Sequence, residues 1–101
     1  AGADPEMMRK VIGVSSGNST LFQMRVEDFL MKNQYQPGFM LDLMKKDMAI
    51  AVDLGKALNV PVPLGAAAYQ MYAAASRLGS GDLDFSAVAK AFEQLSGTSI
   101  A

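Results

Sequence analysis

The chain has 101 residues, half of them apolar and 19% charged, with a formal net charge of −1, a balance that fits one small globular domain. It contains no cysteine and no histidine, which excludes disulfide bonds, cysteine nucleophiles, histidine-based triads and zinc sites built within this chain. The scattered basic residues argue against a nucleic-acid surface, and no apolar stretch approaches the roughly 18–20 residues of a membrane span.

The first predicted helix begins at Asp4 and Pro5. The Asp4 carboxylate is a favourable N-cap, and a proline in the first turn loses no helical hydrogen bond. The helix is expected to run to about Val14, because the small polar residues 15–18 that follow favour a turn.

The second predicted helix begins at Thr20, with Gln23 three residues later. This spacing is typical of a capping box, in which each of the two side chains accepts a hydrogen bond from the backbone N–H of the other residue. We expect the helix to fray near Asn33 and to be closed off by Pro37 and Gly38.

The third predicted helix, about residues 39–58, is the longest. Residues 59–63 contain two prolines, which cannot continue the hydrogen-bond ladder and disfavour helical geometry in the residue before them. Pro63 also suits the first turn of a fourth helix, which is expected to end at Leu78 and Gly79.

The fifth predicted helix is capped by Asp84. Its apolar positions recur at helical spacing: Phe85, Val88, Ala89, Phe92 and Leu95. Strand signals are nearly absent, so the sequence predicts an all-α fold of five helices with short connections, in a bundle-like domain.

The third helix carries the chemical signal. At about 100° per residue, five charged side chains form one solvated stripe: Asp42, Lys45, Lys46, Asp53 and Lys56. Asp47 instead lies among apolar positions: Met40, Leu43, Ala51, Leu54 and Leu58.

A carboxylate on an apolar face is costly unless it is paired. Asp47 is therefore expected either to cap another helix or pair with a base such as Arg25, or to be a buried carboxylate that positions a site lysine. Lys46 lies where the two faces meet. It is either a solvated lysine or an ammonium that reaches an anionic ligand along apolar surface.

At these residues the chain resembles a known family. The run Pro37 to Ala51 is similar to the C-terminal signature of the β-hydroxyacid dehydrogenases, a Phe and apolar residues followed by Lys-Asp-Leu-x-Leu-Ala. Met48 and Ile50 stand where that pattern has leucines. Three further segments match in collinear order: residues 2–6, 60–64 and 79–87. The resemblance spans essentially the whole chain.

The resemblance implies an NAD(P)-dependent dehydrogenase of the 3-hydroxyisobutyrate dehydrogenase and tartronate semialdehyde reductase kind. In these enzymes a helical C-terminal domain, like that of 6-phosphogluconate dehydrogenase, follows a Rossmann domain and a long interdomain helix. The glycine-rich dinucleotide fingerprint and the segment with the family's catalytic lysine do not occur here. Residues 1–101 are therefore expected to be the C-terminal substrate and dimerisation domain, without catalytic residues of its own and inactive alone.

By position, the resemblance implies that Lys46 contacts the NAD or NADP cofactor. Phe39 matches an aromatic residue near the nicotinamide, and Asp47 matches the acid beside that lysine. No metal is expected.

The implied substrate is a small hydroxyacid, and the implied assembly is a homo-oligomer. With no signal-peptide pattern at the first residues, a cytoplasmic location is expected, or the mitochondrial matrix in a eukaryote. The alternative is a free-standing helical interaction module whose apolar faces bind a partner helix.

Overall fold

The computed structural model describes residues 2–99, and within them it contains helices and no strand. The elements in chain order are α1 (Pro5–Gly13), α2 (Thr20–Arg25), the π-helical turn η1 (Val26–Leu30), α3 (Leu41–Leu58), α4 (Pro63–Ala75), the π-helical turn η2 (Ser76–Ser80), the 3-10 turn η3 (Phe85–Val88) and α5 (Ala89–Ser96). The predicted all-α class is confirmed. Among these described elements, none is both long and apolar enough to cross a membrane.

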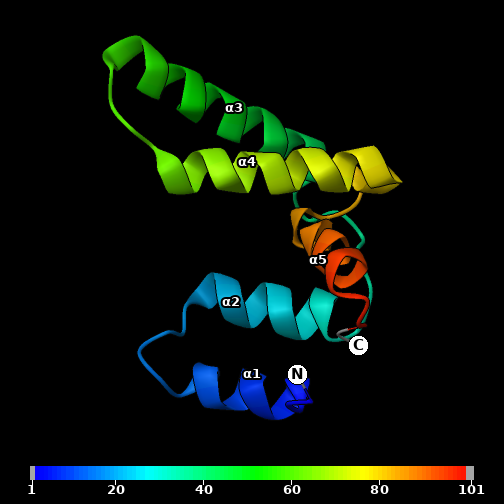
Figure 1. Cartoon of the computed structure of the whole chain (residues 1–101). Helices are drawn as coiled ribbons and strands as arrows, with labels where there is room; N and C mark the ends of the chain where they lie inside the picture. Colours follow the sequence, from blue (N-terminus) through cyan, green and yellow to red (C-terminus); the bar gives the residue numbers. More distant parts are fainter. Residues whose placement is uncertain (1, 100–101) are drawn as a thin grey trace.

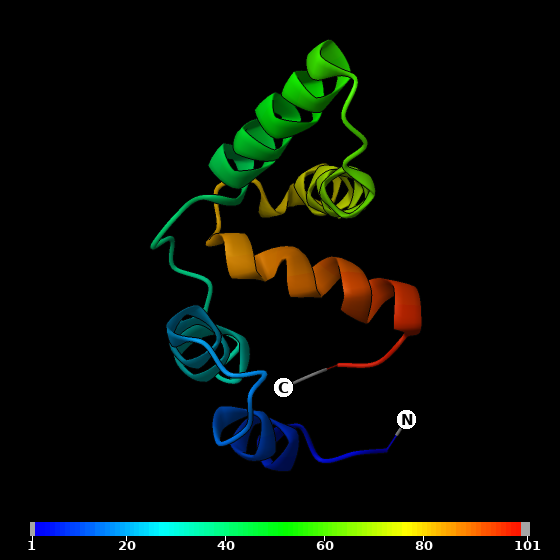
Figure 2. The same ribbon diagram turned by 90° about the vertical axis from the view of Figure 1, so that its left-hand side faces the viewer.

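The helices are arranged as an open arc. Helices α3 and α4 pack together at one end, α1 and α2 lie at the other, and α5 lies between the two pairs (Figures 1 and 2). The Cα radius of gyration is 14.6 Å, against about 13 Å for a typical compact domain of this length. The molecule therefore leaves more of its helix surface uncovered than a closed bundle would.

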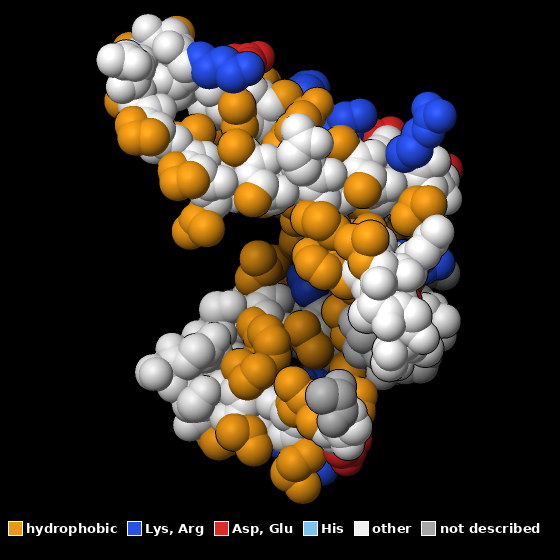
Figure 3. Space-filling view, viewed as in Figure 1, with side chains coloured by type: hydrophobic (Ala, Val, Ile, Leu, Met, Phe, Trp, Pro, Cys, Tyr) orange, Lys and Arg blue, Asp and Glu red, His pale blue; other side chains and the backbone are white. Residues whose placement is uncertain are grey.

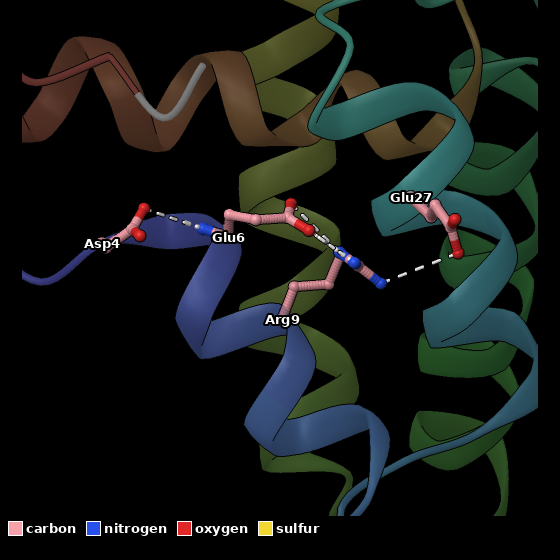
Figure 4. A network of polar contacts seen from close by, with 4 residues as sticks. All are labelled: Asp4, Glu6, Arg9 and Glu27. Atoms are coloured by element: carbon pink, nitrogen blue, oxygen red, sulfur yellow. Dashed lines mark hydrogen bonds and ion pairs between the residues drawn. The ribbon is translucent and has the colours of Figure 1, made fainter.

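Helix α1 begins as predicted. Asp4 Oδ1 accepts a hydrogen bond from the Glu6 amide at 3.2 Å, and Pro5 occupies the first turn. No residue of α1 is buried. A polar network holds it to its neighbour instead: Arg9 bonds Glu6 through Nε at 3.1 Å and reaches Glu27 of η1 at 3.7 Å (Figure 4).

Helix α2 begins at Thr20 as predicted, but its N-cap differs from the predicted one. Ser19, not Thr20, is the N-cap: its backbone is extended, and its Oγ accepts a hydrogen bond from the Phe22 amide at 2.9 Å. Thr20 is already helical, so the predicted Thr20–Gln23 capping box is wrong. The structure agrees with the sequence that the helix unwinds near Asn33, which has a positive φ of 51°.

Helix α3 begins at Leu41 and not at Phe39. The Phe39 amide and carbonyl bond to Asp84 and Phe85, so this residue cannot enter the helix. At its other end α3 closes on Asn59, whose left-handed backbone directs its N–H toward the carbonyl groups of Gly55 and Lys56. Asparagine is one of the few residues that adopts this conformation readily.

The fourth helical stretch continues from α4 into the π-helical turn η2, and Gly79 within η2 leaves helical geometry with a φ of 97°. The predicted cap of the fifth helix is confirmed, because Asp84 Oδ2 accepts a hydrogen bond from the Ser86 amide at 3.1 Å. The helix starts as a 3-10 turn before α5.

The core lies where the segment before α3 meets the end of α4 and the start of α5. Its buried apolar residues are Tyr35, Leu41, Ala75, Ala87 and Ala91. Five partly buried side chains pack around them: Phe29, Met71, Tyr72, Leu83 and Val88. Since three of the buried residues are alanines, the elements approach closely, and fully buried Leu41 anchors the N-terminus of α3.

Candidate functional site

Helix α3 presents two apolar faces, and only one of them is covered. The face toward α4 carries Leu41, Met44, Met48, Val52 and Gly55, all buried or half-buried. The other face is an exposed apolar strip, which we define by Leu43, Ile50, Leu54 and Leu58, with side chains 42%, 58%, 58% and 64% exposed. Exposed apolar strips of this kind mark surfaces that another part of a protein covers.

Asp47 lies within this exposed apolar strip, and Lys46 lies at its edge, where the strip meets the solvated stripe. Both residues are three or four positions from Leu43 and from Ile50. Residues at this spacing are neighbours on one side of a helix. Both charged residues are exposed. Within residues 2–99, no ion pair joins either of them to another residue.

The expected pairing of Asp47 with Arg25 is wrong, and within residues 2–99 the Asp47 carboxylate is not buried. Asp47 is exposed because α4 packs against the opposite face of α3. The acidic partner of Arg25 is Asp84, whose Oδ2 lies 3.7 Å from Arg25 Nε. The predicted solvated stripe is present: Asp42, Lys46, Asp53 and Lys56 are exposed, and Lys45 is half-buried.

Phe39 lies two residues before α3 and is half-buried. Its ring meets the ring of Phe85 edge to face, with centroids 6.3 Å apart and an interplanar angle of 76°, a favourable aromatic geometry. Phe39 N donates to Asp84 Oδ1 at 3.0 Å, and its carbonyl accepts from Phe85 N at 2.7 Å. The ring and both backbone polar groups of Phe39 are therefore held in place, while the residue as a whole is half-buried.

Asp84 is a buried charge that bonds to several residues of this region, whereas the sequence predicted only a helix cap at this position. Its side chain is fully buried and accepts hydrogen bonds from Gly38, Phe39 and Ser86. Burial alone raises the pKa of the Asp84 carboxyl, but the hydrogen bonds from Ser86, Phe39 and Gly38 outweigh it and hold the pKa below its ordinary value. The signal in the sequence was its place in the matching segment 79–87.

Two cavities of the described part of the chain lie away from these residues. One of about 520 Å³ lies beside the turn between α3 and α4 and is lined by Val52, Lys56 and Pro61 among others. Another, of about 500 Å³, lies between α1 and α2. Neither of these two cavities is lined by Phe39, Lys46 or Asp47.

Apolar side chains also gather along the hollow between the α3–α4 pair and the α1–α2 pair (Figure 3). Exposed apolar residues outside α3 include Leu21 and Met24 of α2 and Leu64 of α4. The uncovered surface therefore extends beyond α3.

Residues 1–92 match the family model described as the NAD-binding domain of NADP-dependent 3-hydroxyisobutyrate dehydrogenase. Over 99 residues the chain is 40% identical to 2-(hydroxymethyl)glutarate dehydrogenase of Eubacterium barkeri, covering 98% of this chain and 33% of that protein. It is 42% identical over 91 residues to L-threonate dehydrogenase of Cupriavidus necator, covering 90% and 30%.

The fold is similar to that of a solved relative. The crystal structure of 3-hydroxyisobutyrate dehydrogenase from Salmonella typhimurium superposes with a TM-score of 0.82 at 35% identity, over 88% of this chain and 31% of that one. The chain thus spans about a third of the length of the relatives it matches.

Proposed function

The chain belongs to the β-hydroxyacid dehydrogenase family of 3-hydroxyisobutyrate dehydrogenase, and from this we propose that it serves as the helical C-terminal domain of an NAD(P)-dependent dehydrogenase. In the whole enzyme it would close the cleft over the cofactor and a small β-hydroxyacid. We propose no catalytic residue within the chain, which would be inactive alone. NAD(P), when bound, supplies the hydride chemistry.

The observation that carries the proposal is the position of Lys46 at the edge of the exposed apolar strip of α3, next to Asp47 within the strip. An ammonium flanked on one side by apolar side chains gains strength as a ligand for an anion once a second surface excludes water. Lys46 has no ion-pair partner among the described residues, so its charge is available for a cofactor phosphate or carboxamide oxygen. These features fit a dinucleotide.

Phe39, which is half-buried and precedes α3 by two residues, would contribute its aromatic ring. Its contact with Phe85 uses one side of the residue, and an aromatic surface of this kind suits a planar nicotinamide. Asp47 would orient polar groups beside Lys46. The remaining role of the domain is to exclude water from the reacting atoms.

We further propose that the exposed apolar strip is covered in a homo-oligomer or by the rest of the enzyme, since surface of this kind favours association. The proposed location is the cytoplasm, or the mitochondrial matrix in a eukaryote.

The test is steady-state hydride transfer by the full-length enzyme, with NAD, NADP and a panel of small β-hydroxyacids. Lys46→Ala is compared with Lys56→Ala, a matched control because Lys56 is an exposed lysine of the same helix that lies outside the apolar strip. A hydrogen bond to a charged group contributes about 1.5–3 kcal/mol, so Lys46→Ala should raise the cofactor KM about 10- to 100-fold. Lys56→Ala should leave it unchanged.

Equal kinetics for the two variants would make Lys46 an ordinary surface lysine. A folded full-length protein that is inactive with the whole panel would contradict the dehydrogenase function. A stable complex between this chain and an unrelated helical protein would then favour the interaction module.

A further inference from the structure

The segment that leads into α3 is bonded along its length to residues 81–85. Asp84 N donates to the Tyr35 carbonyl at 3.0 Å, and Leu41 N donates to the Leu83 carbonyl at 2.8 Å. Between these bonds, both backbone polar groups of Phe39 are engaged, its N–H by Asp84 and its carbonyl by Phe85. Phe39 is therefore fixed from both sides by a segment 45 residues later in the chain.

The Asp84 carboxylate has its accepting capacity filled. Oδ1 accepts from Gly38 N at 2.9 Å and from Phe39 N at 3.0 Å, while Oδ2 accepts from the amide and the hydroxyl of Ser86. A fully buried carboxylate is tolerated only with such donors. Because all its donors lie on two segments, the carboxylate ties the loop before α3 to the start of η3.

Arg25 reaches this carboxylate from α2. Its guanidinium carbon lies 4.8 Å from the ring centroid of Phe29 and 5.0 Å from that of Phe85, so the cation is bracketed by two aromatic rings. Its Nε is buried, lies 3.7 Å from Asp84 Oδ2, and has no hydrogen-bond acceptor among the described residues. A planar guanidinium can stack on aromatic rings, which an ammonium cannot do.

The contacts form a continuous series from α2 to the loop. Arg25 supports Phe85, and Phe85 supports the Phe39 ring edge to face. Arg25 also lies directly against the loop, because a Cβ added at Gly38 would come 2.9 Å from Arg25 Nη1. Loss of Arg25 would thus loosen the ring of Phe39 as well as its backbone.

We propose that Asp84 and Arg25 are positioning residues that hold Phe39 in its orientation toward the nicotinamide. This rests on the proposed function, in which Phe39 faces the cofactor. Neither residue touches the cofactor in this proposal. Both act through Phe39, and a displacement of about 1 Å at such a residue is enough to lower kcat/KM about 100-fold.

The test uses the full-length enzyme with Arg25→Lys, which keeps the charge but loses the planar group, and with Asp84→Asn. The control is Asp82→Asn, since Asp82 is exposed in the same loop. Without cofactor, amide hydrogen exchange at Gly38 and Phe39 should be about tenfold faster or more in both variants and unchanged in the control. If Asp84→Asn does not fold, Arg25→Lys still gives the result.

The second readout is a double-mutant cycle with Phe39→Ala. Arg25→Lys should lower kcat/KM and weaken NADH or NADPH binding in the parent background and have little further effect in the Phe39→Ala background. Equal losses in both backgrounds, or unchanged exchange at Gly38 and Phe39, would overturn the inference.

The two proposals fail differently. If Phe39→Ala leaves cofactor affinity unchanged while Lys46→Ala weakens it, the positioning inference is overturned and the proposed function stands. If neither variant changes cofactor affinity, the proposed function has failed.

Discussion

Gly55 and Gly65 lie in neighbouring helices, and replacing each with alanine should change stability in opposite directions. A Cβ at Gly55 would lie 2.9 Å from the Val60 carbonyl oxygen and 3.1 Å from Val62 Cγ2. The carbonyl cannot retreat freely, because Val60 N donates to the Gly55 carbonyl at 2.8 Å. A Cβ at Gly65 would meet only Val62 Cβ, at 3.9 Å, which is an ordinary contact.

The magnitudes follow from two opposing effects. Alanine is favoured over glycine inside a helix by about 1 kcal/mol, whereas overpacking costs about 1–3 kcal/mol. Gly55→Ala should therefore lower the free energy of unfolding by about 1 kcal/mol, and Gly65→Ala should raise it by up to about 1 kcal/mol. A difference of about 2 kcal/mol corresponds to roughly 8–16 °C in Tm for a domain of this size.

The assay is urea denaturation of both variants, followed by far-ultraviolet circular dichroism. Gly65→Ala serves as the control for helix propensity, since it adds the same methyl group without the close contact. If Gly55→Ala stabilised the protein as much as Gly65→Ala does, the turn between α3 and α4 would not press against Gly55, and the reasoning would be refuted.

Two further predictions concern the buried residues around the start of α3. The pKa of Asp84 is lower in the folded state than in the unfolded state. The ionised Asp84 carboxylate therefore stabilises the fold above its unfolded pKa, and this stabilisation is lost as the pH falls through the lower folded pKa. Asp84→Asn should therefore reduce the fall in the urea midpoint between about pH 6 and pH 3. Leu41→Ala, at a fully buried position, should cost about 2.5–5 kcal/mol in the same denaturation assay. Leu43→Ala, at a position 42% exposed, should cost about 1 kcal/mol or less, and equal costs would contradict the assigned faces of α3.

The sequence was sufficient to predict the helices, because their caps and breakers are local. Helix starts are specified by Asp4 and Asp84, whose side chains accept hydrogen bonds from amides two residues later. The prolines after α3 specify the break before α4, because proline cannot continue the hydrogen-bond ladder. The boundary at Phe39 was wrong because it depends on hydrogen bonds to Asp84 and Phe85, which are distant in the chain and leave no periodic signal.

The sequence also could not say which apolar face of α3 is covered. Both faces repeat at helical spacing, so Asp47 was expected to be buried or paired. Packing of α4 against the face of Leu41 and Gly55 leaves Asp47 exposed. The pairing of Arg25 with Asp84 similarly depends on three elements meeting in space. The roles of Lys46, Phe39 and Asp47 stay predictions.

The most direct test of the proposed role is hydrogen exchange of the full-length enzyme with and without NADH or NADPH. A cofactor that binds against Phe39 and Lys46 should slow exchange in residues 38–50 and leave α1, which lies at the other end of the arc, unchanged. Saturating cofactor binding with unchanged exchange in residues 38–50 would contradict a cofactor-facing role for this part of the chain.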